Sequence, residues 1–182
     1  MSHEYSEGRI LIRHFRGDEA GLLFEAVRES VVELSRWMAW CHPGYAREDS
    51  ETFVRSRDAE WDKGEHYSFA IFDSGTGLFL GGAGLNFINR PHNLANLGYW
   101  VRTSQTGRGV APTAARLVAR FGLIELGFNR IEILTAVGNL ASQRVAEKTG
   151  ARSEGLLRKR LVVHDQTFDA LMFSIVREDL KT

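Results

Sequence analysis

Alternating apolar and polar residues mark several strands along the chain. The run Arg9–Phe15 alternates in this way and predicts an opening strand. The same period of two returns after His66, where segments 67–72 and 78–87 flank the turn Asp73–Gly77 and predict an antiparallel hairpin. Further strands are predicted over 96–101, over 130–137 and on both sides of His164–Gln166.

Segments with helical periodicity lie between these strands. Asp18 and Ser30 look like two helix starts, because Ser30 has Glu33 three residues later, the spacing of a capping box. Other helices are predicted over 47–63, from Gly107 to about Gly127, and over 139–149. In the second of these, the apolar positions through Ile124 share one face. The order predicts one mixed α/β (α+β) sheet with helices on both faces, in a single domain over residues 1–182.

Composition and charge narrow the class of protein. The chain has 43% hydrophobic and 25% charged residues and a formal net charge of zero, which argues for a globular protein and against a general nucleic-acid binder. The charges are unevenly placed: residues 1–101 carry 10 Lys and Arg against 15 Asp and Glu, whereas residues 102–160 carry 11 against 4. The middle of the chain would therefore attract a polyanionic ligand, and the first half a cationic one.

Several sites and locations are disfavoured by the sequence. No run approaches 18 apolar residues and the N-terminus lacks the pattern of a signal peptide, so we expect a cytoplasmic protein that does not enter a membrane. Cys41 is the single cysteine, which excludes an intrachain disulfide and a cysteine-based metal cluster. Its neighbour His42 points elsewhere on any regular element, so Cys41 is expected to be a packed thiol and not a nucleophile.

The segment after the strand at 96–101 carries the clearest chemical signal. Gly107-Arg108-Gly109 precedes a long helix, and a glycine-rich turn of this kind lets backbone N–H groups face a phosphate at the helix N-terminus. The Gly-Lys-Ser/Thr of a P-loop is absent, and Pro112 stands where a dinucleotide fingerprint needs a third glycine. Alone, the glycines are also consistent with a simple tight turn.

A second signal follows the strand at 130–137. Asn139 is suited to cap the next helix, and Ser142 would then project from its first turn toward the neighbouring strand. By itself this pattern is ordinary capping chemistry. It indicates a functional site only because the glycine turn precedes it at this distance in the sequence.

Taken together, these motifs resemble the GNAT superfamily of acetyltransferases. The resemblance runs through Gly98-Tyr-Trp-Val101, Gly107-Arg-Gly-Val-Ala111, Asn139-Leu-Ala-Ser142 and Val145-Ala-Glu-Lys-Thr-Gly150. The segments Leu34–Pro43 and Glu154–Arg160 resemble the branch that acetylates ribosomal-protein N-termini, which also contains acetylases of small molecules and antibiotic peptides. The resemblance implies a sheet splayed between the strands at 96–101 and 130–137, with the pantetheine arm of acetyl-CoA in the wedge and no metal.

The resemblance also assigns residues to that site. It places backbone groups of Tyr99, Trp100 and Val101 on the pantetheine arm and Asn139 beside it. It makes Ser142, near the sulfur, the catalytic residue. The remaining assignments are the pyrophosphate turn, Gly107, Arg108, Gly109, Val110 and Ala111, and the acceptor pocket, Trp37, Trp40, Asn86 and Tyr99. Trp37 and Trp40 are three residues apart and are expected to share a helix face, where core packing is the alternative explanation.

One departure from the family pattern bears on the acceptor. Leu161 stands where ribosomal-protein-serine acetyltransferases have a glutamate proposed as the base, and His66 is a candidate to replace it. At pH 7.5 an α-amine with a pKa of about 7.8 is roughly one-third neutral, against about 0.1% for a lysine amine. The sequence therefore favours an α-amine, of a protein N-terminus or a peptide, as acceptor. A small-molecule amine, a silent acyl-CoA-binding module, an unrelated nucleotide-binding domain and a homodimer stay open.

Overall fold

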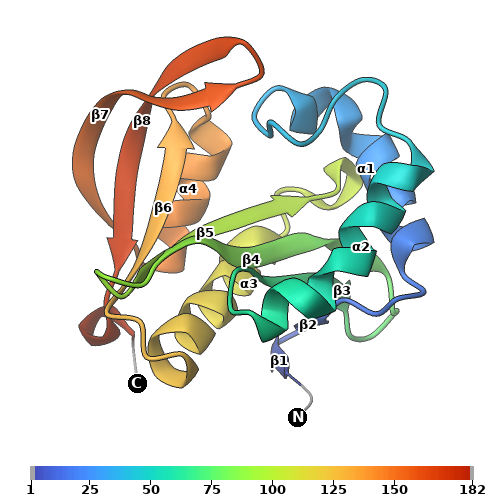
Figure 1. Cartoon of the computed structure of the whole chain (residues 1–182), viewed down its shortest axis with the longest axis horizontal. Coiled ribbons are helices and arrows are strands. Elements are labelled where there is room, and N and C mark those ends of the chain that lie inside the picture. Colours follow the sequence, from blue (N-terminus) through green and yellow to red (C-terminus); the bar gives the residue numbers. More distant parts are fainter. Residues whose placement is uncertain (1–2, 181–182) are drawn as a thin grey trace.

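The computed structural model describes residues 3–180, and its eight strands form one sheet (Figure 1). The strand order across the sheet is β1-β2-β3-β4-β5-β6-β8-β7. Every neighbouring pair is antiparallel except β5 and β6. The strands are β1 Glu4–Glu7, β2 Ile10–His14, β3 Tyr67–Asp73, β4 Phe79–Asn89, β5 Leu94–Val101, β6 Arg130–Ala136, β7 Arg152–Val163 and β8 Gln166–Ile175.

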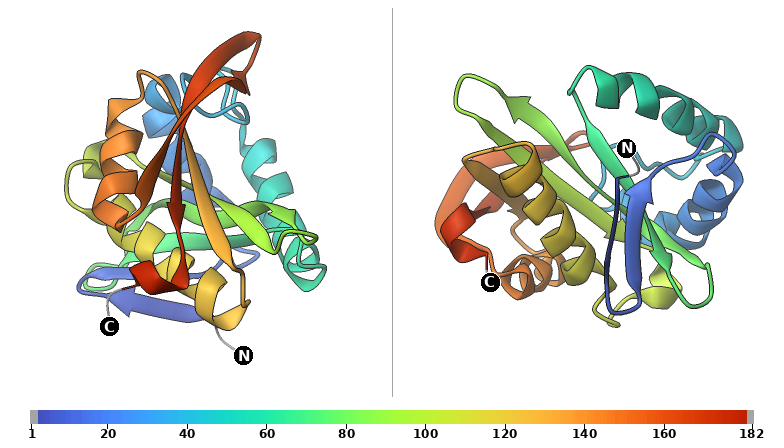
Figure 2. Two further views of the ribbon diagram at one scale, coloured as in Figure 1. Left: turned by 90° about the vertical axis from the view of Figure 1, so that its left-hand side faces the viewer. Right: turned by 90° about the horizontal axis from the view of Figure 1, so that it is seen from below.

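Helices cover both faces of this sheet, as the two further views in Figure 2 show. One face packs against α1 and α2, and the other against α3 and α4. The four helices are α1 Ala20–Ser35, α2 Arg47–Asp62, α3 Val110–Arg120 and α4 Leu140–Thr149. Short turns are η1 Thr103–Gln105, the π-helical η2 Phe121–Glu125 and η3 Arg177–Asp179. The predicted mixed sheet with helices on both faces is confirmed.

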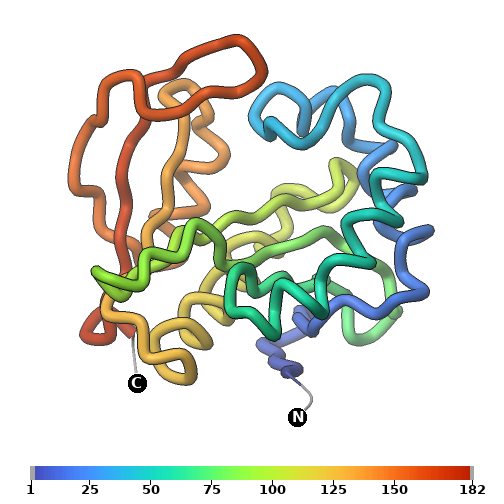
Figure 3. Tube along the Cα trace, viewed as in Figure 1, coloured from blue at the N-terminus to red at the C-terminus, as the bar shows by residue number. Residues whose placement is uncertain are grey.

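The sheet splays between β5 and β6. These strands pair only at their beginnings, where Leu94–Asn96 lie beside Arg130–Glu132. Beyond that point β5 stays with β4, while β6 turns away with β8, as the trace in Figure 3 shows. The N-terminal half of the sheet and the β6–β8–β7 part are thus joined at one edge and open at the other.

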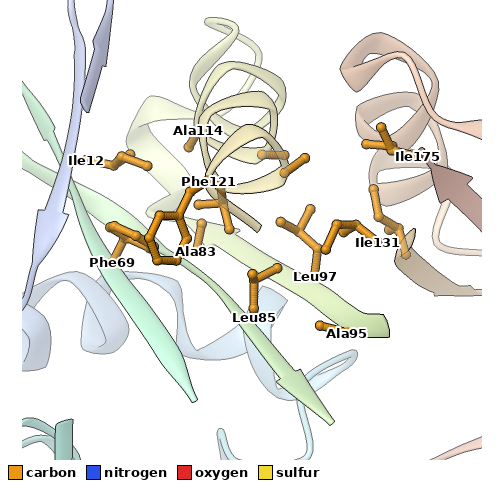
Figure 4. Close-up of a cluster of buried hydrophobic side chains, with 14 of the residues drawn as sticks. Ile12, Phe69, Ala83, Leu85, Ala95, Leu97, Ala114, Phe121, Ile131 and Ile175 are labelled. Carbon is orange, nitrogen blue, oxygen red and sulfur yellow. The ribbon is translucent and has the colours of Figure 1, made fainter. Parts of the chain in front are cut away.

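A large apolar core between the sheet and α3 holds the two parts together. Phe121 packs edge-on against Phe69, with ring centroids 5.2 Å apart, and both side chains are almost fully buried (Figure 4). Ile131 of β6 and Leu97 of β5 belong to the same cluster, so the core continues across the splay. Burial of each large apolar side chain contributes about 1.5–3 kcal/mol, which fixes α3 against both parts of the sheet.

Three local predictions are wrong. Ser30 does not begin a helix, because α1 runs continuously through it and its hydroxyl donates to the Ala26 carbonyl at 2.8 Å. Trp37 and Trp40 do not share a helix face, because α1 ends at Ser35 and both lie in the turns that follow. Ile124 is 46% exposed, because the π-helical turn after α3 shifts the helical period and rotates it away from the core.

Candidate active site at the splayed strands

The turn between β5 and α3 leaves room for a ligand. Gly107 and Gly109 have φ angles of 75° and 78°, in the left-handed region that favours glycine, and a Cβ on either would have no atom within 4 Å. Gly109 precedes the 11-residue helix α3, whose first turn has no acidic residue and no side-chain cap. Val110 is buried in the core, so only its backbone reaches the turn, whereas the Arg108 side chain is exposed. This open turn at a helix N-terminus fits a phosphate or pyrophosphate.

The start of this turn is held by α1. The Glu29 carboxylate accepts from the backbone N–H of Ser104 at 2.9 Å and from Arg102 Nε at 2.9 Å. Ser30 Oγ accepts from the backbone N–H of Thr103 at 2.9 Å. Hydrogen bonds from Arg102 and Ser104 lower the pKa of Glu29 to about 2. Sequence reasoning missed Glu29 and the role of Ser30, since the residues they bind are more than 70 positions away.

One edge of β5 is free to pair with a ligand. Tyr99, Trp100 and Val101 pair with Ala83, Gly82 and Gly81 of β4 on one side. On their other side, no strand within residues 3–180 pairs with them, because β6 has already diverged. An extended arm carrying amide groups would find backbone partners here, as the family resemblance implies for pantetheine.

Ser142 lies beside Tyr99 in the wedge between the strands. The hydroxyl of Tyr99 donates to the carbonyl oxygen of Ser142 at 2.9 Å and lies 3.1 Å from Ser142 Oγ. The side chain of Asn139 accepts from the backbone N–H of Ser142 at 3.1 Å, so the predicted N-cap of α4 is confirmed. Burial raises the pKa of Tyr99 to about 12, so this hydroxyl stays protonated at neutral pH. Tyr99, Asn139 and Ser142 thus form one hydrogen-bonded group.

The opposite face of the same strands has a half-buried strip of small and polar residues. Gly84 of β4 pairs directly with Gly98 of β5, and the neighbouring pair is Asn86 and Asn96, whose side chains share a 2.8 Å hydrogen bond. We call this strip, Gly84, Gly98, Asn86 and Asn96, the glycine floor. It lies on the α1 and α2 side of the sheet, because Trp100, two residues after Gly98, packs into the α1 cluster.

Aromatic residues border the floor on one side. Trp100 covers Gly82, where a Cβ would lie 2.8 Å from its Nε1 atom. Its ring centroid is 5.9 Å from that of Trp40, which is 44% exposed. Asn86 and Trp40 therefore lie toward the same face, whereas the hydroxyl of Tyr99 lies at Ser142. The structure does not bring the four predicted acceptor residues into one cluster.

Trp37 lies apart from Trp40, against the β7–β8 hairpin. Its ring centroid is 6.0 Å from that of Phe168, and its edge lies 3.8 Å from a Cβ placed on Gly138 at the end of β6. His164 at the hairpin tip contacts the Ser35 carbonyl at 3.0 Å, so the hairpin reaches the end of α1 (Figure 1). A cavity of about 460 Å³ opens between them. Its lining residues are Ser35, Arg36, Trp37, Val163, His164, Asp165, Gln166 and Phe168.

Two further candidate residues have clear surroundings. Leu161 lies half-buried on β7 opposite Phe168 of β8, so its position is apolar. Cys41 is fully buried, and burial raises the pKa of its thiol, which disfavours the thiolate that a nucleophile requires. Within residues 3–180, no three His, Cys, Asp or Glu side chains gather as a metal site would need. No helix of that range is long and apolar enough to cross a membrane.

Comparison with known proteins agrees with this geometry. The family model of the "Acetyltransferase (GNAT) domain" matches residues 9–152. The chain is 26% identical over 172 residues to the "Putative ribosomal N-acetyltransferase YdaF" of Bacillus subtilis (strain 168), covering 93% of this chain and 92% of that protein.

Solved structures share the whole fold. One from Vibrio cholerae, described as "a putative ribosomal-protein-serine acetyltransferase", has a TM-score of 0.82 at 26% identity and covers 95% of this chain and 97% of its own. RimL, a "Ribosomal L7/L12 alpha-N-protein acetyltransferase" solved with coenzyme A, has a TM-score of 0.85 at 19% identity over 93% of this chain and 95% of its own. The chain therefore belongs to the GNAT family and is an acetyl-CoA-dependent N-acetyltransferase.

Proposed function

We propose that this enzyme, as one domain over the whole chain, acetylates the N-terminal α-amine of a protein or peptide, with a ribosomal protein as the first candidate. The observation that carries the proposal is the glycine floor on the face opposite Ser142. Its glycines place no side chain over β4 and β5, and the amide of Asn86 lies 3.4 Å from a Cβ placed on Gly98, so a polar group borders the strip where an extended chain end would lie. The names of the Bacillus subtilis relative and the Vibrio cholerae structure support a ribosomal acceptor.

The donor side of the wedge would hold acetyl-CoA. The amides of Gly107 to Ala111 would bind its pyrophosphate, and the free edge of β5 at Tyr99–Val101 would pair with its pantetheine arm. The basic balance of residues 102–160, 11 Lys and Arg against 4 Asp and Glu, favours such a polyanion. Tyr99 and Asn139 would then place Ser142 beside the thioester sulfur.

The reaction is a direct transfer. The neutral amine attacks the thioester carbon, the carbon–sulfur bond breaks, and its electron pair stays on sulfur. The Ser142 hydroxyl donates a hydrogen bond to the departing sulfur, and the Tyr99 hydroxyl, which donates to the Ser142 carbonyl oxygen at 2.9 Å, positions the first turn of α4 that carries Ser142. A hydrogen bond of this kind is stronger in the transition state, where negative charge develops on the sulfur, than in the neutral thioester.

Charge and basicity favour an α-amine over lysine. The first half of the chain, which supplies α1, α2 and the glycine floor, carries 15 acidic against 10 basic residues and attracts a cationic acceptor. An α-amine is neutral far more often than a lysine amine near pH 7.5, a difference on the order of 3.5 kcal/mol.

The proposal is tested by acetyl-CoA turnover, read as release of free thiol, against a panel of amines. The panel contains a peptide with a free N-terminus, the same peptide with a blocked N-terminus and one lysine, and small primary amines. Thiol release with the first peptide, and N-terminal acetylation seen by mass spectrometry, are the expected result. Turnover of the small amines alone would overturn the assignment. Coenzyme A binding without any turnover would do the same, in favour of a silent binding module.

A further inference from the structure

A buried arginine on α2 lies close to the glycine floor. Arg57 is 7% exposed and stacks on Phe53, with its guanidinium carbon 4.1 Å from the ring centroid. Its Nη1 donates to Ser68 Oγ at 2.9 Å and its Nη2 to Ser56 Oγ at 2.7 Å. Burial lowers the pKa of Arg57, and a buried cation is tolerated only where it is well paired. Its carboxylate partner is Glu60, 2.7 Å away.

Glu60 connects this arginine to His66. One carboxylate oxygen faces Arg57, and the other accepts from His66 Nδ1 at 2.5 Å. Burial raises the pKa of Glu60, but the hydrogen bond from Ser56, the charge of Arg57 and the contact with His66 together lower it overall. An ionised Glu60 keeps the proton of a neutral imidazole on Nδ1, which leaves Nε2 as the open nitrogen. The His66 side chain is 42% exposed, so solvent reaches the ring.

The sheet register places His66 at the end of a polar row beside the floor. Tyr67 is the first residue of β3 to pair with β4, opposite Leu85, and His66 directly precedes it, so an extension of this register would lead from His66 toward Asn86. Asn86 pairs with Asn96, and Asn96 pairs with Glu132 of β6. Because Ser68 pairs with Gly84 and bonds to α2, His66 two residues earlier lies toward the same face.

This placement puts His66 on the same face of the sheet as the glycine floor, two strands away from Gly98. Strands lie about 4.8 Å apart, so β3 and β5 are about 10 Å apart in the sheet. The imidazole stands off the sheet toward α2, where Glu60 holds it, so a chain of waters above Asn86 and Asn96 would carry the proton from Gly98 to Nε2. Asn96 Nδ2 donates to Asn86 Oδ1 at 2.8 Å, and Asn96 Oδ1 is buried without a hydrogen-bond partner among residues 3–180, as expected where a bound water belongs.

We propose that His66, oriented by Glu60 and Arg57, is the general base that takes the proton from the acceptor amine. This inference rests on the proposed acetyl transfer. The amine nitrogen forms the bond to the acetyl carbon as the carbon–sulfur bond breaks, and the excess proton on nitrogen passes through water to Nε2 of His66. The proton then leaves to solvent or to the thiolate, which restores neutral His66. His66 thus replaces the carboxylate that Leu161 does not provide.

Glu132, at the other end of the row, is less suited to this role. Its carboxylate accepts from Arg130 Nε at 2.9 Å, and Arg130 also binds Glu154 at 2.7 Å. The Glu132 carboxylate is therefore already engaged by a guanidinium. The Arg130 guanidinium is thus shared between two carboxylates, and Glu132 belongs to the ionic cluster that joins β6 to β7.

The charged groups related to His66 by contact, by sequence or by the polar row come from four elements. Glu60 and Arg57 belong to α2, and Glu65 precedes His66 in its own segment. Arg90, on the β4–β5 hairpin, donates to the Gly64 carbonyl at 2.8 Å, and Glu132 closes the row on β6. This set contains more carboxylates than cations. The ionisation of every group in it contributes to the measured pH dependence of kcat/KM.

The test is the pH profile of kcat/KM for two peptides whose N-terminal pKa values differ by about one unit. In the wild type, both the amine and His66 must be neutral, so the logarithm of kcat/KM falls with a slope approaching two at acid pH. The upper ionisation moves with the peptide, and the lower one, which belongs to the enzyme, stays fixed. In His66→Gln the fixed ionisation disappears, the slope falls to one, and kcat/KM drops by about 100-fold at pH 8.

Three variants separate this role from a structural one. His92→Gln, in an exposed loop, is the matched control and keeps the wild-type profile. Glu60→Gln lowers kcat/KM by about tenfold but retains the fixed ionisation, because the imidazole is still present. Glu132→Gln keeps the fixed ionisation as well. Coenzyme A affinity and Tm, measured for each variant, identify any that fails to fold.

The outcomes distinguish the two proposals. A wild type that releases no thiol with any amine refutes acetyl transfer itself. A wild type that turns over, together with a folded His66→Gln variant of unchanged profile, overturns the assignment of His66 alone. Loss of the fixed ionisation in Glu132→Gln would identify the Glu132 carboxylate as the general base. That result would equally overturn the assignment of His66.

Discussion

The carboxylate of Glu29 on α1 accepts a hydrogen bond from the backbone N–H of Ser104 at 2.9 Å, 75 positions along the chain. Ser104 lies in η1, just before the glycine turn that would hold the pyrophosphate. A helix on one face of the sheet therefore anchors the loop that leads to the N-terminus of a helix on the other face. Coenzyme A binding should depend on this anchor even though Glu29 lies outside the turn.

We expect Glu29→Gln to weaken coenzyme A binding by about fivefold, because a hydrogen bond to a charged group contributes more than one to a neutral amide. Because the folded-state pKa of Glu29 is lowered to about 2, its stabilising contribution is present above the unfolded-state pKa. It is lost as pH falls through about 4.5 toward 2. Calorimetric Kd values and Tm from pH 7 to pH 2 check both effects. The exposed Glu25→Gln on the same helix is the control, and an equal loss in both variants would contradict the anchor.

Gly109→Glu should abolish coenzyme A binding in a folded protein. The φ angle of 78° strains any side chain there, and a carboxylate would repel the pyrophosphate at the helix N-terminus. Gly127→Glu is a closely matched control, since Gly127 has a φ angle of 70°, equally open surroundings and a place beyond α3. Both variants should lose similar stability in thermal denaturation. Equal coenzyme A affinity in the two would rule out the turn as the pyrophosphate site.

Ser142→Ala should lower kcat by about 100-fold while coenzyme A affinity changes little, as expected for a group that acts on the leaving sulfur. The backbone N–H of Ser142 still donates to Asn139, so the helix start is preserved. Tyr99→Phe should have a smaller effect, because it keeps the hydroxyl of Ser142 and removes only the hydrogen bond to the Ser142 carbonyl. Stopped-flow thiol release and equilibrium binding give the two quantities. Full turnover by Ser142→Ala would reduce this serine to a helix-start residue.

Thiol reagents should leave the activity unchanged. Cys41 is fully buried and the pKa of its thiol is raised, so its thiolate is both scarce and shielded. Labelling by an aromatic disulfide should appear only when the protein is denatured. Rapid labelling of the native enzyme with loss of turnover would instead indicate that Cys41, next to His42, acts as a nucleophile.

The sequence correctly predicts the features that depend on residues close together in the chain. Asn139 caps α4 because cap, first turn and preceding strand are contiguous, and the hairpin around Asp73–Gly77 follows from one turn. Sites made by distant segments were not predictable from periodicity. The Glu29–Ser104 bond joins α1 to η1, and the Trp37–Phe168 contact depends on how the β7–β8 hairpin folds over the end of α1.

Irregular backbone limited the remaining predictions. The strand Glu4–Glu7 was not predicted, because four mostly exposed residues carry little apolar pattern and are held by pairing with Ile10–Arg13. The helical periodicity predicts Ile124 on the buried face only if the α-helix is continuous, whereas a π-helical turn begins at Phe121. The fold therefore followed from the sequence more fully than the acceptor side of the site did.

The acceptor preference can be measured directly with two peptides of one sequence. We expect the peptide with a free N-terminus and no lysine to outrun the peptide with a blocked N-terminus and one lysine by at least 100-fold at pH 7.5. The reason is that about one-third of an α-amine is neutral at that pH, against about 0.1% of a lysine amine.

The pH dependence tests the same preference independently of peptide binding. If the neutral α-amine is the nucleophile, the upper ionisation in kcat/KM belongs to the substrate, because the enzyme must wait for that amine to lose its proton. Lowering the N-terminal pKa by about one unit, with a different first residue, should move that ionisation down by a similar amount. Rates measured from pH 6 to pH 9.5 at constant ionic strength give the shift. An upper ionisation that stays in place for both peptides would show that an enzyme group, and not the acceptor amine, sets the rate.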